Sequence, residues 1–175
     1  MSNWYTEIQT NEPLMQGQII FKCPVLVLSS TVEVNDLEEE QEAELNALIV
    51  EKDVIVLTQA CDLENQNVDQ VLLAEIIDSD SKNAAIEINT GKRPRRHLLN
   101  RKIDGEVQMN YKVVDFSYVY TLPLSYLQPQ LKNLGIRLQL NTPYAEYVSQ
   151  RFGAYYSRIG LPNGISKEEI KEFHK

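Results

Sequence analysis

The amino-acid sequence predicts an α+β fold, in which short antiparallel strands form a small, strongly bent β-barrel and a long amphipathic helix follows near the C-terminus. Runs rich in Val, Ile and Leu recur through the first 140 residues, turn-forming residues separate them, and a well-marked helix start comes only at Thr142-Pro143. A chain of 175 residues is expected to form a single domain, residues 1–175, whose core needs no disulfide or metal.

Composition limits the classes of function. A net charge of -8 argues against a general nucleic-acid binder, because affinity for phosphate rests on clustered Lys and Arg. No apolar stretch approaches the roughly 20 residues that a membrane helix requires, and the N-terminus lacks the pattern of a signal peptide. We therefore expect a soluble, cytoplasmic protein with no membrane partner. Cys23 and Cys61 adjoin apolar runs, which predicts two buried, reduced thiols.

The predicted organising element is a buried β-hairpin. Residues 54–57 and 70–77 are short apolar runs, each of a length suited to a strand. The segment between them is polar and includes Asp62, Glu64 and Asn65, which are common in turns. The rest of the chain is expected to cover this hairpin.

The segments before the hairpin are less regular. Residues 1–16 predict an irregular lead-in, and residues 17–28 predict two strand segments with a break at Pro24, which should mark an edge position, a bulge or the bend between the segments. Residues 33–53 form an acidic insertion with nine acidic residues and one basic residue, Lys52. It is either a helix from Leu37 to about Ile49 or a loop between strands. Its function is either to keep the protein soluble or to dock a basic partner.

Further elements follow the hairpin. Residues 84–88 predict a short strand or helical turn, residues 107–127 predict sheet, and residues 136–140 predict another strand. In the long helix, Thr142 is the expected cap and Gly160 the stop, with apolar residues on one face. These apolar residues are Tyr144, Val148, Phe152, Tyr155 and Ile159. A short tail helix is expected within residues 163–175.

One segment, residues 92–102, is basic, with six positive charges within eleven residues. We call it the basic segment, and its candidate binding residues are Lys92, Arg93, Arg95, Arg96, His97, Arg101 and Lys102. It predicts either a loop that contacts RNA phosphates, with Tyr118 or Tyr120 stacking on bases, or a solvated loop that pairs with the acidic insertion. In the second case the basic segment would pair with the acidic insertion of the same chain, or with that of a second copy in a homo-oligomer. The same positive charges would also suit an acidic protein partner.

Catalytic and metal sites receive little support from the sequence. Cys61, Asp62 and His97 are residue types that form a thiolate with its base, or a metal site. Nothing in the sequence brings His97 near Cys61, and the chain has only two His with no paired-ligand spacing. We therefore predict no catalytic residue, no metal and no cofactor.

Short strings in the first half resemble a known family. Gly17-Gln-Ile-Ile, Val54-Ile-Val-Leu-Thr58 and Val71-Leu-Leu-Ala-Glu-Ile look like the opening strands of the MazF/PemK-like SH3-barrel toxins. The resemblance implies an SH3-like barrel and a metal-independent endoribonuclease. Those toxins use an Arg before the second strand and a Ser or Thr after the third. Here the stretch before Val54 is acidic, and Ser79 is the hydroxyl nearest to Ile76-Ile77-Asp78. The C-terminal half, from Leu138 through Pro162, resembles uncharacterised bacterial proteins.

Two functions follow as expectations. The preferred one is a non-enzymatic, cytoplasmic protein-interaction module of SH3-barrel type, acting as an accessory or regulatory component of a bacterial stress or defence system, such as a toxin-antitoxin system. The alternative is a MazF-like endoribonuclease that uses the basic segment. Arg93, Arg95 or His97 would then stabilise the phosphorane-like transition state and transfer a proton.

Overall fold

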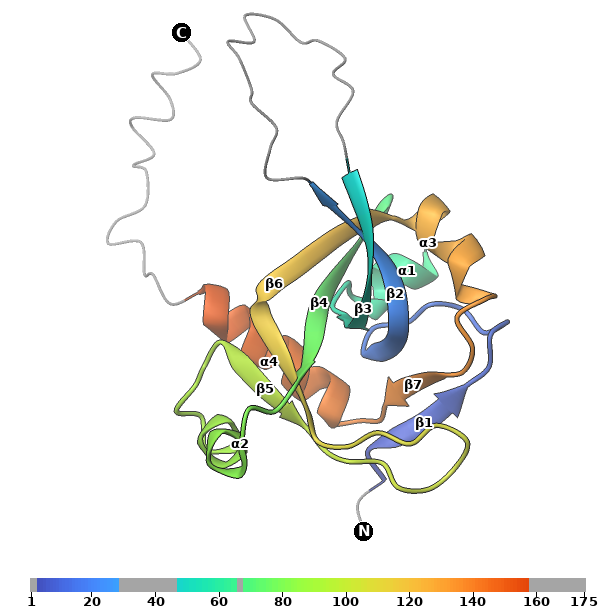
Figure 1. Cartoon of the computed structure of the whole chain (residues 1–175). Coiled ribbons are helices and arrows are strands. Elements are labelled where there is room, and N and C mark those ends of the chain that lie inside the picture. The colour runs from blue at the N-terminus through green and yellow to red at the C-terminus, as the bar shows by residue number, and fades with distance from the viewer. Residues whose placement is uncertain (1–2, 29–46, 66–67, 158–175) are drawn as a thin grey trace, which may run out of the picture.

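The computed structural model describes residues 3–28, 47–65 and 68–157, which form a seven-stranded antiparallel sheet with four short helices (Figure 1). The strand order is β1-β7-β2-β3-β4-β6-β5. The strands are β1 (Tyr5–Ile8), β2 (Gln18–Leu28), β3 (Ala47–Val56), β4 (Gln70–Asp78), β5 (Arg96–Leu99), β6 (Lys112–Pro123) and β7 (Arg137–Leu140). The helices are α1 (Ala60–Glu64), α2 (Lys82–Asn89), α3 (Leu124–Leu131) and α4 (Tyr144–Tyr156).

The central strands are buried on both faces. Val54 and Val56 of β3 pack in a core with residues of α1 and α3, whereas Ile55 between them packs in a second core with residues of α4. All three side chains are buried. A strand that is covered on both sides has no polar face, which is why this run is apolar without alternation.

The predicted barrel is wrong, because the sheet is open. The end strands β1 and β5 pair only with β7 and β6, and no ladder joins them within the described ranges. Helices on both sides give each face of the sheet its cover, so closure is not needed to bury apolar surface. The two ends still approach each other. The Tyr5 hydroxyl donates to the Asn100 carbonyl at 2.7 Å, and the Glu7 carboxylate binds the Lys102 ammonium at 2.8 Å.

The predicted long C-terminal helix is also corrected. Within the described residues it is α4, which has 13 residues and is capped by Pro143 without a side-chain bond. Thr142, the expected cap, instead donates its hydroxyl to the Glu146 carboxylate at 2.9 Å. The apolar face of α4 is confirmed, because Val148 is buried and Phe152 packs on the core beside it. The expected stop at Gly160 and the tail helix in 163–175 lie outside the described residues.

The predicted hairpin is confirmed as the pair β3 and β4, with Val54 opposite Glu75, although its polar connection contains the short helix α1. The segment left open between strand and helical turn is the helix α2. β2 runs through Pro24 without a break, and its irregularity lies between Ile20 and Cys23. Among the described strands β2 pairs only with β3 at Pro24, because β7 joins β2 only at Gln18 and Ile19, so the expected edge position of Pro24 is confirmed.

Three further predictions are corrected. The lead-in contains the strand β1, and the sheet predicted for 107–127 ends at Pro123, where α3 follows. Of the acidic insertion, residues 33–46 lie outside the described residues, and residues 47–53 belong to β3, so the predicted helix does not extend to Ile49.

The two cysteines differ. Cys23 is buried, as predicted, and burial raises the pKa of its thiol to about 12. Cys61 is exposed, so its predicted burial is wrong, because α1 turns this side chain away from the core. Both are free thiols. In the described part of the chain, no helix combines the length and apolar character needed to cross a membrane.

Two glycines test the contact between the sheet ends. Gly105 and Gly91 have nearly equal positive φ angles, +81° and +80°, which penalise any other residue by about 1 kcal/mol. A Cβ atom at Gly105 would collide with the Glu7 carboxylate and the Lys102 ammonium, whereas one at Gly91 would meet nothing within 4 Å. We expect Gly105→Ala to lower the unfolding free energy more than Gly91→Ala, as measured by urea denaturation. Equal losses would show that the Glu7–Lys102 pair does not hold this loop.

Candidate functional site

Part of the basic segment forms a strand and not the expected loop. Its residues Arg96–Leu99 form β5, which pairs with β6 so that Arg96 lies opposite Asp115 and Leu99 opposite Lys112. Because successive side chains of a strand point to opposite faces, Arg96 and Leu98 lie on one face and His97 and Leu99 on the other. The pairing therefore separates the candidate binding residues.

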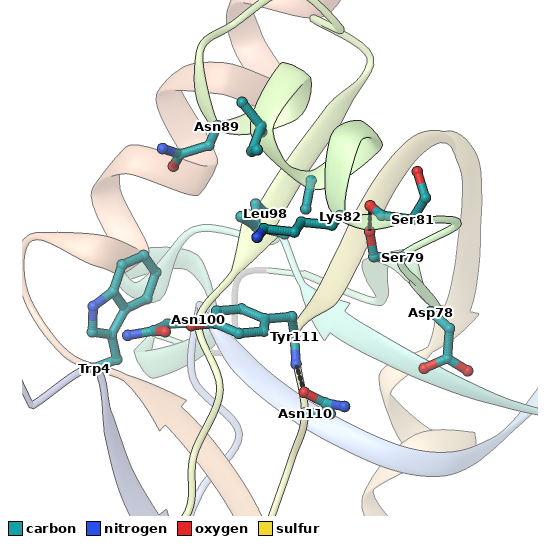
Figure 2. A pocket seen from close by; sticks show the side chains of 12 residues that line it. Trp4, Asp78, Ser79, Ser81, Lys82, Asn89, Leu98, Asn100, Asn110 and Tyr111 are labelled. Atoms are coloured by element: carbon teal, nitrogen blue, oxygen red, sulfur yellow. Dashed lines mark hydrogen bonds between the residues drawn. The ribbon is translucent and has the colours of Figure 1, made fainter.

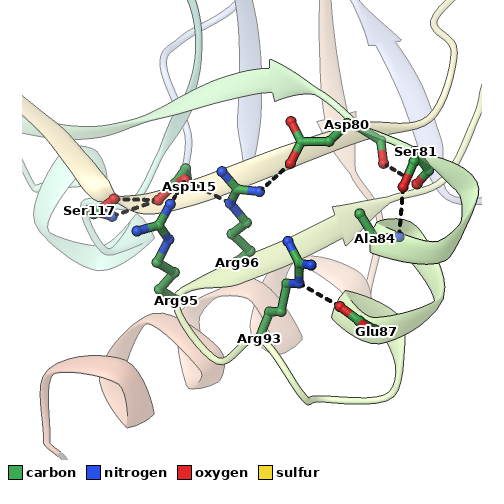
Figure 3. A network of polar contacts seen from close by, with 10 residues as sticks. Asp80, Ser81, Ala84, Glu87, Arg93, Arg95, Arg96, Asp115 and Ser117 are labelled. Atoms are coloured by element: carbon green, nitrogen blue, oxygen red, sulfur yellow. Dashed lines mark hydrogen bonds and ion pairs between the residues drawn. The ribbon is translucent and has the colours of Figure 1, made fainter.

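A buried carboxylate, Asp115, forms ion pairs with two arginines of the basic segment, Arg95 and Arg96 (Figure 3). Its side chain is 0 % exposed, and the Arg96 Nε donates to it at 2.9 Å. The same guanidinium donates through Nη1 to Asp80 at 2.9 Å, and Arg95 Nη2 lies 3.5 Å from Asp115. The Ser117 hydroxyl and amide also donate to Asp115. Arg96 therefore joins the end strand β5 to β6 and to the segment before α2.

The Asp115 carboxyl is ionised at neutral pH. Burial raises its pKa, but the two hydrogen bonds from Ser117 and the bond from Arg96 together hold the pKa below its usual range. Arg93 forms a separate, more exposed pair with Glu87 at 2.7 Å. Each of the three arginines therefore has a carboxylate partner in its own chain, and these partners are not residues of the acidic insertion.

The three arginines line one hollow, of about 480 Å³, with Asp80, Pro94 and Tyr155. A phosphate entering it would compete with Asp80 and Asp115 for the guanidinium groups. The remaining cations lie elsewhere: Lys92 and Arg101 are exposed, and Lys102 is buried against Glu7. The basic segment is therefore not a single basic surface.

His97 is separated from the arginines of its segment. It is 3 % exposed, its ring meets the Tyr147 ring edge-on at 5.3 Å, and its Nε2 has no hydrogen-bond partner. Burial, and then the charge of Arg151, lower its pKa to about 4, so the imidazole is neutral at pH 7. The structure thus does not bring His97 together with the arginines, as the endoribonuclease hypothesis requires.

The hypothesis built on Cys61, Asp62 and His97 also lacks geometry. Cys61 and Asp62 belong to α1, which Figure 1 shows beside α3, well away from β5 and His97. Within the described part of the chain, the Cys61 sulfur forms hydrogen bonds only with Gln59 and Asp62, at 3.7 and 3.8 Å. Across residues 3–28, 47–65 and 68–157, no group of three His, Cys, Asp or Glu side chains could hold a metal ion.

One pocket was missed by sequence reasoning. A cleft of about 710 Å³ lies between α2, the strand β5 and the residues that flank β6, with Trp4 at its side (Figure 2). It is lined by Trp4, Asp78, Ser79, Ser81, Lys82, Ala85, Ile86, Asn89, Leu98, Asn100, Asn110 and Tyr111. These residues come from segments far apart in the sequence and follow no period, so only the fold assembles them.

Exposed apolar side chains gather on another surface. Residues 23–28 of β2 and 47–52 of β3 pair with each other, and we call this ribbon the β2–β3 arm (Figure 1). Leu26 and Ile49 are cross-strand partners on one face of the arm, exposed by 41 % and 65 %, and Leu48, on the other face, is exposed by 59 %. No described strand pairs with the other edge of β3 over this length, because β4 joins β3 only from Val54 onward.

Comparison with known proteins adds no functional assignment. No family model matches this chain, and no curated protein matches it. The resemblance to the MazF/PemK-like toxins and to uncharacterised bacterial proteins therefore stays a prediction. The function has to be judged from the arginine cluster, the cleft and the β2–β3 arm themselves.

Removing the buried carboxylate should be costly. We expect Asp115→Asn to lower the unfolding free energy at pH 7 by about 3 kcal/mol, because it leaves Arg96 with only its exposed partner Asp80. Glu87→Gln, which removes an exposed pair, is the control and should cost at most about 1 kcal/mol. The difference between Asp115→Asn and wild type should shrink as pH falls below about 4, because a carboxyl with a lowered pKa stabilises the fold only while it is ionised.

The buried imidazole of His97 predicts that the unfolding free energy falls as the pH falls. A histidine paired with a carboxylate has the opposite effect, because its raised pKa stabilises the fold at low pH. The His97 pKa of about 4 in the folded protein is below the unfolded value of 6.5, so unfolding takes up a proton between these values. At about 1.4 kcal/mol per pKa unit, His97 should reduce the unfolding free energy by about 3 kcal/mol between pH 6.5 and pH 4. His97→Leu should show a shallower pH dependence, and NMR titration should find the wild-type His97 neutral at pH 6. A normal imidazole pKa would contradict this account.

Proposed function

We propose that this chain is a non-enzymatic, cytoplasmic protein-interaction module whose partner binds the β2–β3 arm. The observation that carries the proposal is the combination, on residues 47–52 of β3, of exposed apolar side chains and an edge with which no described strand pairs. Edge strands present free backbone N–H and C=O groups, and proteins usually protect them with charge, Pro or a covering segment. The arm itself contains Pro24, Glu51 and Lys52, but within the described residues no segment covers its apolar side chains Leu48 and Ile49.

Addition of a partner strand would satisfy both features of the arm. Backbone groups of the partner would pair with the free edge of β3, and its side chains would cover Leu48 and Ile49, which is a common mode of peptide recognition. Full burial of side chains of this size contributes about 1.5–3 kcal/mol each. Two such contacts with a backbone ladder can support a specific complex.

Charge favours a basic partner. The chain carries a net charge of -8, and nine of its acidic residues fall in the acidic insertion, which includes the β3 part of the arm. Opposite charge on a partner raises the rate of encounter more than it raises affinity. A partner strand flanked by Lys or Arg is therefore the best match to this surface.

The endoribonuclease alternative receives less support. Arg93, Arg95 and Arg96 are paired with carboxylates, and the neutral His97 lies on the opposite face of β5. A role in a bacterial stress or defence system stays a prediction, since no relative supports it.

A matched pair of variants tests the interaction surface. Wild type should capture proteins from a lysate of the source cells, Ile49→Lys should lose them, and Ile103→Lys should keep them. Ile103 is a matched control, because it is exposed by 61 % and Ile49 by 65 %, but only Ile49 is on the arm. With a purified partner, calorimetry should show at least about tenfold weaker binding for Ile49→Lys, a loss of about 1.4 kcal/mol.

Two results would contradict the proposal. One is equal affinity of Ile49→Lys and wild type for every captured partner. The other is cleavage of short single-stranded RNA, without added metal, by wild type but not by the triple variant Arg93→Ala, Arg95→Ala, Arg96→Ala. The second result would establish the endoribonuclease in place of the interaction module.

A further inference from the structure

We infer that the cleft between α2 and β5 binds a small ligand made of a planar aromatic ring and an anionic group, in the size range of a mononucleotide. This goes beyond the proposed protein interaction, because the cleft and the β2–β3 arm share no residue. The volume of about 710 Å³ lies within the 300–1,000 Å³ typical of small-molecule sites.

The walls of the cleft suit a flat apolar group. Leu98, Ala85 and Ile86 supply aliphatic surface, and Trp4 and Tyr111 supply aromatic surface. Ile86 and Tyr111 are exposed by 53 % and 43 %, so apolar area remains uncovered in the protein alone. A ligand ring in this cleft would remove that area from water.

The aromatic wall is held in place before any ligand arrives. Trp4 stacks on Tyr144 with ring centroids 3.9 Å apart and an interplanar angle of 13°. Figure 2 shows Trp4 on one side of the cleft and Tyr111 across from it. A side chain that is already ordered loses little entropy when a ligand binds, so this surface is prepared for stacking.

Two asparagines of the polar lining, Asn100 and Asn110, offer hydrogen-bond donors to a ligand. Asn100 Oδ1 accepts from the Arg101 amide at 2.9 Å, and Asn110 Oδ1 accepts from the Tyr111 amide at 2.8 Å. The amide oxygens are thus used within the protein, while no described group accepts from the two NH2 groups. These donors match acceptor atoms on a ligand.

One cation in the cleft is not neutralised. Lys82 extends from α2 toward the middle of the cleft, and no carboxylate of the described residues forms an ion pair with it (Figure 2). Asp78 is the one carboxylate in the lining, and the Lys112 ammonium holds it at 3.0 Å. A ligand anion would form a charge-assisted hydrogen bond with Lys82, which is stronger than a bond between neutral groups.

The single tryptophan of the chain, Trp4, provides a direct signal. We would titrate the full chain with adenosine 5′-monophosphate and with its two halves, adenosine and ribose 5-phosphate, and follow Trp4 fluorescence. The aromatic carboxylate 4-hydroxyphenylacetate tests a carboxylate in place of the phosphate. Calorimetry under the same conditions guards against quenching without binding. The inference expects at least one aromatic anion to bind more tightly than both adenosine and ribose 5-phosphate.

Variants assign the contacts. Lys82→Ala should weaken binding of the aromatic anion about tenfold and leave adenosine unchanged, whereas Tyr111→Ala should weaken both. Lys92→Ala, an exposed lysine outside the cleft, is the control and should bind like wild type. Lys82 and Tyr111 are both exposed, so neither change should alter the thermal unfolding midpoint by more than the control does.

Three results would overturn the inference: no binding of any probe, binding of ribose 5-phosphate as tight as that of the aromatic anions, or no effect of Lys82→Ala. The test is independent of the proposed protein interaction. Ile49→Lys should leave the ligand titration unchanged, and Lys82→Ala should leave partner capture unchanged, so failure of one proposal is distinguishable from failure of the other.

Discussion

The buried carboxylate of Asp115 is the constraint on which the end of the sheet depends. It lies in β6 with no exposed surface and is ionised, so it requires donors from its surroundings. Arg96 and Ser117 supply them, and Arg96 also binds Asp80. A buried charge without partners would be very unfavourable. The need to satisfy Asp115 therefore holds a basic, weakly apolar segment in the sheet as β5.

The position of β5 in turn determines what the basic segment can do. Once Arg96 is directed to Asp115, His97 must point to the other face, where it is buried against Tyr147 of α4. Leu98 returns to the face of Arg96 and forms part of the cleft wall. Most of the charges that look like a nucleic-acid surface in the sequence thus form ion pairs within the fold, and the two surfaces that we propose for binding, the cleft and the arm, lie elsewhere.

The sequence allowed prediction of the elements that local patterns specify. The apolar runs of β3 and β4 and the apolar face of α4 reflect burial and are present, and the strand predicted over residues 136–140 is present as β7, although its Arg137 is buried as well. β5 was missed because its stabilising partner, Asp115, is 19 residues from Arg96. The cleft was missed for the same reason. Its lining is collected from separate segments, and none of them carries a pattern of its own.

β6 shows how a shift of register gives neighbouring aromatic side chains different surroundings. Phe116, Tyr118 and Tyr120 alternate with other residues along this strand. The register against β4 shifts between Ala74 and Glu75, which face Val119 and Asp115, so residues 116–118 have no partners on β4. A bulge of this kind turns side chains locally. Phe116 is therefore buried in the core, while Tyr118 is 56 % exposed.

The sequence predicts a strongly bent, closed barrel. The sheet is open, but the approach of its two ends creates the cleft. β1 and β5 stand at opposite ends of the strand order, yet Tyr5 and Glu7 of β1 reach Asn100 and Lys102, just after β5. Trp4 immediately precedes β1, so these contacts carry its ring to the side of the cleft formed by α2 and β5. A flatter sheet would leave Trp4 far from this surface, and a closed ladder would place backbone where the cleft is. The pocket exists because the two ends of the sheet meet through side chains and not through a backbone ladder.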